Sequence, residues 1–253
     1  MQRQSLTYSM KWFCALVVAV LLAGGTVNGQ TQIKVYAGLG FNAGYMSVDS
    51  LNWIIDQYNE RQSNVERPLK NVQTPLGVSG QLGLVFGKFI IDLGYTTRMT
   101  GSRSRENVNA TTGTYLTRQL RFRANTFDVG AGAVIAETDN TMFSLGGSVD
   151  FGAVKVFTRY STNDQVGTIP LNAPVMNELT LGTTVYFQGM VNIGLNNPLY
   201  LYFRPFYSYA WNKNDFQPVN RAVNFQTHLD DPLFILANPH NVGLKIGIAF
   251  YGG

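Results

Sequence analysis

The sequence has little charge and few of the residues that most often carry chemistry. Asp, Glu, Lys and Arg make up 13% of the 253 residues, about half of the ~25% usual in soluble domains. Basic residues number 19 and acidic residues 15. This near balance argues against a nucleic-acid binder. The 26 glycines and the 13% of aromatic residues argue against a disordered chain or a charged coiled coil.

Cysteine occurs once, as Cys14, inside an N-terminal apolar run. The run covers residues 13–23, follows Arg3 and Lys11, and is succeeded by small residues up to Gly29. It is shorter than a membrane-spanning helix, so it predicts a secretory signal peptide, residues 1–29, that is cleaved. Residues 30–253 then form a single domain. Without a cysteine, that domain has no disulfide and no thiol chemistry.

The rest of the chain alternates between apolar and other residues with the period of two that is typical of β-strands. No run approaches the ~18 apolar residues of a membrane-spanning helix. In each segment, one face is apolar and carries no charged residue. The eight segments are 35–43, 78–86, 89–97, 127–135, 143–151, 187–195, 201–209 and 242–250.

The opposite face of these segments is rich in glycine and carries four cations and four anions. Apolar-out and polar-in is the pattern of a transmembrane β-barrel, the reverse of a soluble lipocalin-like barrel. An Arg or Lys facing lipid at mid-bilayer costs roughly 2–4 kcal/mol, which explains the uncharged face. Eight strands leave a lumen filled by side chains, so we expect the inward charges to form an ion-pair network, the alternative being conduction of protons or ions through it. These are Lys34, Asp92, Arg98, Asp128, Asp150, Glu178, Arg204 and Lys245.

Short and long connections alternate between the segments. Tight turns are expected at 87–88, 137–140 and 196–198, and long loops at 46–75, 100–117, 159–177 and 212–239. This is the pattern of short periplasmic turns and longer extracellular loops. The sequence of the first loop predicts a short helix, capped by Asp49. Its apolar face could cover the barrel mouth, lie on the membrane or bind a partner. The alternative is that it packs on the protein's own loops. Pro205, in mid-strand, predicts a local bulge.

These features resemble the small eight-stranded outer-membrane proteins of the OmpA/OmpX type, and most closely the barrel families of Bacteroidota. The resemblance covers residues 33–251 and rests on the alternation rather than on a motif. It implies an all-β, antiparallel, up-and-down barrel in the outer membrane of a Gram-negative bacterium. It also implies insertion by the barrel-assembly machinery, although Phe250 and Tyr251 are followed by two glycines rather than ending the chain.

Six basic residues are expected close together above the membrane. Counting up from the turn at 137–140, two arginines emerge on the outward face of the fourth segment, and a lysine and an arginine on the fifth. Two more arginines are placed in the adjoining loop. Guanidinium groups grip phosphates bidentately, so we expect contact with lipopolysaccharide phosphate, the alternative being an ordinary solvated rim. The residues are Arg103, Arg105, Arg121, Arg123, Lys155 and Arg159.

Neither histidine stands in a recognisable catalytic or metal pattern. His228 and His240 lack a serine two residues away, and only Asp230 and Asp231 offer further ligands nearby. We therefore expect no catalytic residue, no metal and no cofactor. The sequence favours a non-enzymatic envelope protein with a plugged lumen that meets partners through its loops. A barrel component of a secretion or gliding assembly is the alternative, and a lipid-modifying enzyme the next.

Overall fold

The computed structural model describes residues 33–62, 64–109, 112–162, 173–194, 197–224, 236–237 and 239–252. The predicted signal peptide, Cys14 and His228 lie outside these ranges. Eight long strands form the molecule: β1 (Ile33–Ser47), β3 (Leu76–Phe86), β4 (Phe89–Asn109), β5 (Thr114–Glu137), β6 (Thr141–Thr162), β7 (Met176–Asn192), β8 (Leu199–Ala210) and β11 (His240–Gly252). The short elements are α2 (Asp49–Arg61), β2 (Val65–Arg67), β9 (Asn214–Asp215), α3 (Gln217–Asn224) and β10 (Leu236–Ala237).

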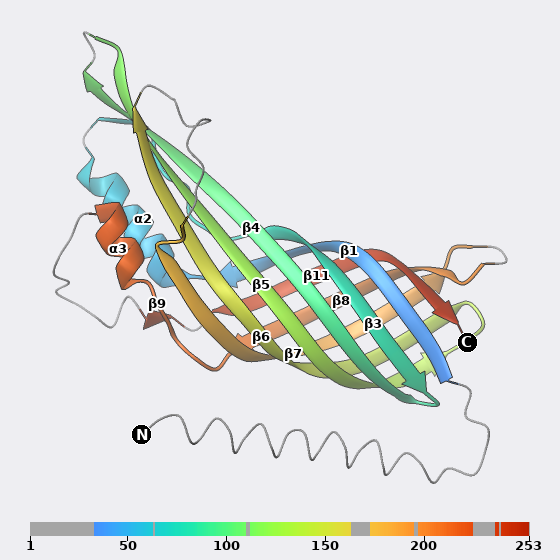
Figure 1. Cartoon of the computed structure of the whole chain (residues 1–253). Coiled ribbons are helices and arrows are strands. Elements are labelled where there is room, and N and C mark those ends of the chain that lie inside the picture. The colour runs from blue at the N-terminus through green and yellow to red at the C-terminus, as the bar shows by residue number, and fades with distance from the viewer. Residues whose placement is uncertain are drawn as a thin grey trace, which may run out of the picture.

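The eight long strands close into an antiparallel barrel (Figure 1). Each strand pairs with its neighbours in sequence, and β1 pairs with β11 to complete the ring. Closure gives every wall strand two partners. No edge of the eight described strands is then left with unpaired N–H and C=O groups, for which lipid offers no hydrogen-bond partner. The fold class predicted from the alternation is confirmed.

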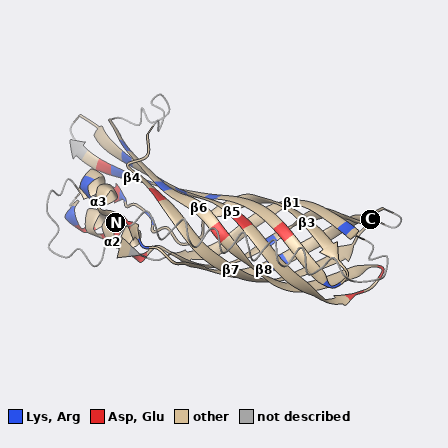
Figure 2. Ribbon diagram, turned by 60° about the horizontal axis from the view of Figure 1, so that its bottom comes forward, with Lys and Arg blue, Asp and Glu red and all other residues tan. Residues whose placement is uncertain are grey.

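The barrel wall has the predicted sidedness. Outward side chains are large, apolar and exposed, such as Phe41 at 76% and Leu39 at 72% exposure. Their inward neighbours include Tyr36 at 0% and Asp92 at 1%. Acidic and basic positions lie midway along the wall (Figure 2). With apolar side chains outside and charges inside, the wall suits a lipid surround and spans a membrane.

The segment 100–117 is not the loop that was expected. β4 runs on to Asn109 and β5 starts at Thr114, so the two strands continue as a paired hairpin beyond the barrel. β6 extends beside them to Thr162. In Figure 1 these three strands rise past the mouth at the end that carries the helices. We call residues 99–109, 114–125 and 153–162 the β4–β5–β6 extension.

The two faces of the extension exchange polarity relative to the barrel. On β5 the outward face changes from Phe127 to Arg123 and Arg121, while the inward face changes from Asp128 to Phe122. Outside the bilayer the outward face meets water, and the inward face meets protein. The alternation therefore persists, but from about residue 125 onward the outward face is polar and the inward face is apolar.

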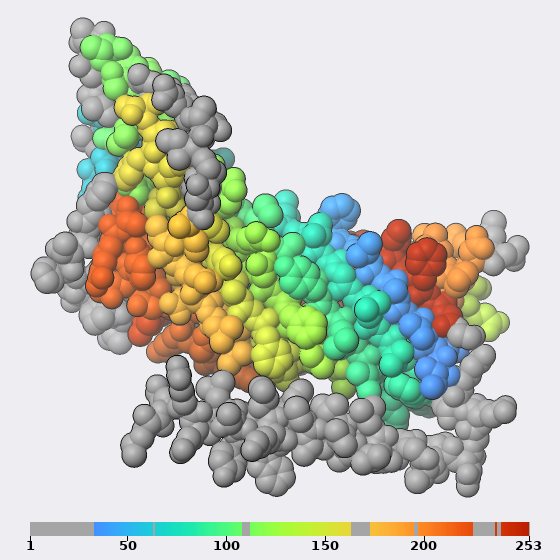
Figure 3. All heavy atoms as spheres, viewed as in Figure 1, coloured from blue at the N-terminus to red at the C-terminus, as the bar shows by residue number. Residues whose placement is uncertain are grey.

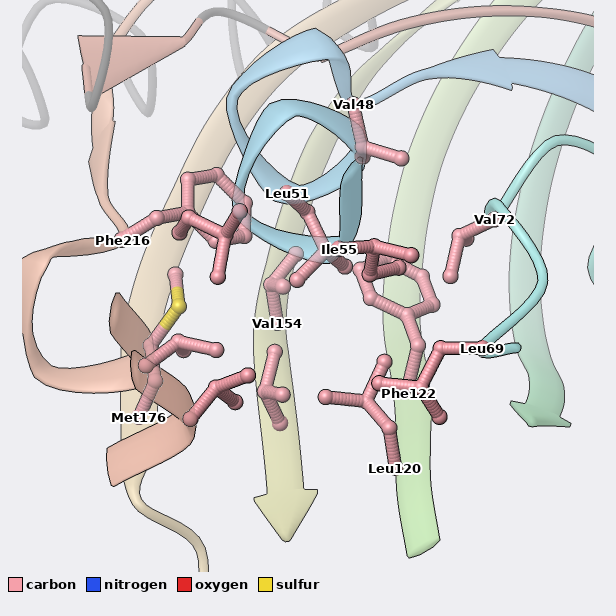
Figure 4. Close-up of a cluster of buried hydrophobic side chains, with 14 of the residues drawn as sticks. Val48, Leu51, Ile55, Leu69, Val72, Leu120, Phe122, Val154, Met176 and Phe216 are labelled. Atoms are coloured by element: carbon pink, nitrogen blue, oxygen red, sulfur yellow. The ribbon is translucent and has the colours of Figure 1, made fainter. Parts of the chain in front are cut away.

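An apolar core covers the inward face of the extension (Figure 4). Leu51, Ile54 and Ile55 of α2 are fully buried against it. Val219 and Val223 of α3 join the same cluster, together with Leu120 and Phe122. The apolar face of α2 thus packs within the protein itself, against strands and α3 as well as loop residues, which is the alternative of packing on its own chain. Asp49 is the first helical residue and not the cap, which is Val48.

Two local expectations were wrong. The sixth strand, expected at 187–195, is β7 at Met176–Asn192, because the strand begins earlier in residues whose alternation is weaker. Pro205 causes no bulge. The pairing of β7 with β8 is interrupted opposite Pro205 and resumes in the same register at Gly189 and Phe203. Proline lacks a backbone N–H, so it can interrupt the hydrogen bonds of the ladder without a bulge. Among the described helices, none is long and apolar enough to cross a membrane.

Candidate functional site

The lumen is organised around one buried ion pair between β4 and β8. The Arg204 guanidinium lies 2.6 Å from the Asp92 carboxylate, and both side chains are at most 2% exposed. Tyr186 and Tyr36 donate hydrogen bonds to the same carboxylate, at 2.9 and 3.1 Å. Arg204 also donates through Nε to Gln188 at 2.7 Å. A buried pair with this many additional hydrogen bonds cross-links strands on opposite sides of the barrel.

Four of the other expected lumen charges lie near one another, and Asp128 and Asp150 are cross-strand partners on β5 and β6. Lys245 and Asp128 approach to 3.7 Å. Asp150 accepts hydrogen bonds from Ser148 and Thr184, and Arg98 is buried beside it, lining the same small cavities of about 50 and 20 Å³.

Lys34 and Glu178 stand apart from these groups. Lys34 donates to Glu137, the last residue of β5, at 2.6 Å. Glu178 lies opposite Val154, near the β4–β5–β6 extension, and is only partly buried. The tyrosines and Gln188 were missed by the sequence reasoning, which selected inward residues by formal charge; inward parity alone would have found Tyr36 and Tyr186. Glu137 was missed because it was assigned to the turn at 137–140.

The half of the lumen near the short turns is closed by apolar packing. Tyr36, Tyr202 and Met190 are fully buried there and belong to one cluster with Val85 and Ile90. The ion pair of Asp92 and Arg204 lies directly above this cluster, since Tyr36 belongs to both. This packing fills the barrel axis with side chains, and the two small cavities lie above it.

The basic residues lie in four cross-strand rows on the outward face of the β4–β5–β6 extension. Nearest the barrel, Met99 pairs with Arg123 and Arg123 with Lys155. The next row holds Arg121 between Gly101 and Phe157, and the third holds Arg103, Gln119 and Arg159. Arg105 lies in the fourth. Rows two residues apart are separated by about 7 Å. We call this surface the basic face; Arg103 and Arg105 belong to a strand rather than to a loop.

Acidic residues are absent from the outward positions of 99–107, 115–125 and 153–161. Arg105, at the margin of the basic face, has an acidic neighbour: its guanidinium lies 3.7 Å from the Glu66 carboxylate of β2 and stacks on the Tyr115 ring. Arg159 and Arg123 donate to the neutral amides of Gln119 and Asn125.

Arg121, Arg123 and Lys155 have no carboxylate partner among the residues that the structure describes. Arg123 and Lys155 stand directly opposite one another on adjacent strands. Like charges in this position repel and destabilise the pairing, so an anion that bound between them would relieve the repulsion.

His240 is the described histidine, and it lies at the outer rim of the barrel. Its Nδ1 atom is 3.1 Å from the Tyr207 hydroxyl, and its ring lies 5.0 Å from the ring of Tyr209. Both tyrosines are outward-facing and partly exposed, as is Trp211 at the same rim. These residues form an interfacial aromatic girdle. Over the described ranges, no three His, Cys, Asp or Glu residues gather as metal ligands would.

Comparisons with known proteins find likeness in fold only. No family model and no curated protein matches the sequence. Among solved structures, Ail of Yersinia pestis, in complex with the heparin analogue sucrose octasulfate, is 9% identical and covers 87% of this chain and 99% of its own, with a TM-score of 0.39. Neisserial surface protein A is 13% identical and covers 86% and 96%, with a TM-score of 0.37. The outer-membrane protease OmpT from Escherichia coli is 9% identical and covers 90% and 100%, with a TM-score of 0.40.

Proposed function

We propose that this chain is a non-enzymatic outer-membrane barrel that binds the phosphate groups of lipopolysaccharide on its basic face. The observation that carries the proposal is the cluster of Arg121, Arg123 and Lys155, which has no carboxylate partner among the described residues. Two guanidinium groups and an ammonium group side by side suit a phosphate, because Arg binds its oxygens bidentately.

The height of this cluster supports the same ligand. On β5 the outward face is apolar at Phe127 and basic from Arg123 onward, about 13 Å further along the strand. The cations therefore start where the apolar belt ends, at the level of lipid head groups. In a Gram-negative outer membrane, the outward leaflet at that level carries the phosphates of lipopolysaccharide.

The experiment is to quantify lipid A that co-purifies in mild detergent. The variant Arg121→Gln/Arg123→Gln/Lys155→Gln should retain at least fivefold less lipid A per barrel than the wild type. The control Arg221→Gln/Lys70→Gln/Lys213→Gln removes the same charge from exposed residues outside the basic face and should retain the wild-type amount. Equal retention by both variants would contradict the proposal.

The non-enzymatic part of the proposal has its own support. His240 is engaged with Tyr207 and Tyr209 at the rim, and the buried Asp92 carboxylate is neutralised by Arg204. Neither arrangement presents a nucleophile beside a free general base. We expect mass spectra of lipid A from wild-type and deletion cells to be identical; an acyl chain or phosphate that is lost only in the wild type would mean that the protein is an enzyme.

A further inference from the structure

A hollow in the lipid-facing wall lies below the basic face. It has a volume of about 450 Å³ and is lined by side chains of five adjacent strands. Leu82, Leu93, Tyr95, Phe127 and Ile248 border it, each between 43% and 57% exposed. All of them face outward at the depth of the apolar belt. The neighbouring strands β1, β3, β4 and β5 lie side by side on this flank (Figure 3).

The hollow exists because Gly80 interrupts a row of large side chains. Gly80 stands between Leu39 on β1 and Tyr95 on β4 in the sheet register. Both neighbours project outward, so the missing side chain leaves a groove between them. A Cβ atom at Gly80 would meet the Leu39 side chain at 3.5 Å, an ordinary contact. The backbone at this position therefore accepts a larger residue, and the wall does not need glycine for its own packing.

The groove and the basic face share two strands. Tyr95 and Phe127, at the groove, are a cross-strand pair of β4 and β5. Four residues further along the same two strands, the pair is Met99 and Arg123, with Lys155 beside Arg123. At about 3.3 Å per residue, the cations lie about 13 Å from the upper edge of the groove. The groove and the cluster of Arg121, Arg123 and Lys155 therefore lie close enough for one lipid molecule to reach both.

We infer that the groove at Gly80 seats one acyl chain of the same lipopolysaccharide molecule whose phosphate lies on Arg121, Arg123 and Lys155. This inference rests on the proposed function, because the head-group contact fixes which lipid is held. The groove adds selectivity for the acyl part: a chain lying in it contacts Leu82 and Phe127 on both sides rather than a flat wall. The protein would then recognise an acylated, phosphorylated glycolipid as a unit, and not phosphate alone.

The test compares two probes on the detergent-solubilised full-length protein by native mass spectrometry. One probe is hexa-acylated, bisphosphorylated lipid A, and the other is the bare bisphosphorylated glucosamine disaccharide. Gly80→Phe should weaken lipid A binding at least fivefold and leave disaccharide binding unchanged. Arg121→Gln/Arg123→Gln/Lys155→Gln should weaken both. Ala133→Phe, which adds the same ring to a lipid-facing position outside the groove, should change neither.

The outcomes separate the two ideas. If Gly80→Phe binds lipid A as tightly as the wild type while the triple variant loses both probes, the groove inference is wrong and the phosphate site stands. If the triple variant keeps both probes, the proposed function fails as well. Phosphatidylglycerol serves as a competitor. If it displaces lipid A at equal concentration, the groove selects acyl chains without regard to the glycolipid head group, and the inference is overturned.

Discussion

At the scale of single residues, the Asp92–Arg204 pair is the contact that most depends on both of its members. Its atoms lie 2.6 Å apart in an environment that water does not reach. Removing one partner leaves the other charge buried and uncompensated, at a cost of roughly 3–5 kcal/mol. We expect Asp92→Asn to lower the free energy of unfolding by about that amount in urea titrations of the detergent-solubilised barrel.

The double variant Asp92→Asn/Arg204→Met provides the control for this prediction. Since it removes both charges, its loss should be clearly smaller than the sum of the two single losses. Strictly additive losses would show that the two side chains do not stabilise the lumen as a pair.

A second residue-scale prediction concerns pH and Glu137, at the end of β5. Burial alone would raise the pKa of Glu137, but hydrogen bonds from Lys34 and Tyr251 outweigh it and lower that pKa. A lowered folded-state pKa means that the carboxylate stabilises the fold above the unfolded pKa of about 4.3. The stabilisation is lost as the pH falls through the lower, folded value.

The substitution Glu137→Gln should therefore matter at neutral pH and not in acid. For a partly exposed pair, the difference in unfolding free energy at pH 7 should be about 0.2–1 kcal/mol. It should shrink as the pH is lowered below about 4. Urea titrations at pH 7, 5 and 3 measure it; a gap that stays constant across the three would contradict the assignment.

At the scale of elements, α3 is fastened to the extension by Arg118 of β5. The guanidinium is buried, stacks 3.2 Å from the centre of the Tyr160 ring, and donates to the Ala222 carbonyl oxygen of α3 at 2.8 Å. Burial lowers the pKa of Arg118 to about 10, while its interaction with Tyr58 acts in the opposite direction. The group therefore stays charged at neutral pH.

Replacing Arg118 should loosen α3 and leave the barrel intact. Arg118→Met removes both the hydrogen bond to the Ala222 carbonyl oxygen and the stacking on Tyr160. We therefore expect trypsin to cut after Arg221 at least tenfold faster. The barrel should still migrate as a folded species on unheated gels. Arg103→Met, on the exposed face of β4, is the control, and trypsin should cut it after Arg221 at the wild-type rate. An unchanged rate in Arg118→Met would show that the helix is held by its apolar contacts alone.

At the scale of the whole molecule, the strands and their sidedness were predictable because lipid imposes one rule on every outward position. Phe89, Ile91 and Leu93 follow that rule, and so their face could be assigned from parity. The β4–β5–β6 extension was not predictable in the same way. Its outward residues, such as Arg121, meet water, and its inward residues, such as Phe122, meet helices. Alternation persisted, but polarity no longer identified the lipid side.

The candidate site was predictable to a smaller degree. Parity placed Arg121, Arg123, Lys155 and Arg159 on one face, because alternation fixes the direction of a side chain without knowledge of its partners. It could not show that Arg105 is engaged by Glu66, since that contact depends on β2 returning beside β4 from the first loop. The groove at Gly80 depends on three strands in register, which one sequence does not reveal.

The filled axis also predicts the electrical behaviour of the molecule. The buried cluster of Tyr36, Tyr202 and Met190 packs the axis beneath the ion pair, and an eight-stranded barrel has just enough interior for its side chains. Planar-bilayer recordings should therefore show no stable open channel. A steady, large conductance from the purified protein would contradict the sealed lumen.

The most direct test of the central claim, that the outward residues face lipid, is an accessibility scan along β4. Single cysteines at 90, 91, 93, 95 and 96, in a Cys14→Ser background, are spin-labelled in lipid vesicles and their exposure to dissolved oxygen is measured. Positions 91, 93 and 95 should show high oxygen accessibility and positions 90 and 96 low accessibility. The reverse alternation, or an equal response at all five positions, would contradict a lipid-embedded barrel.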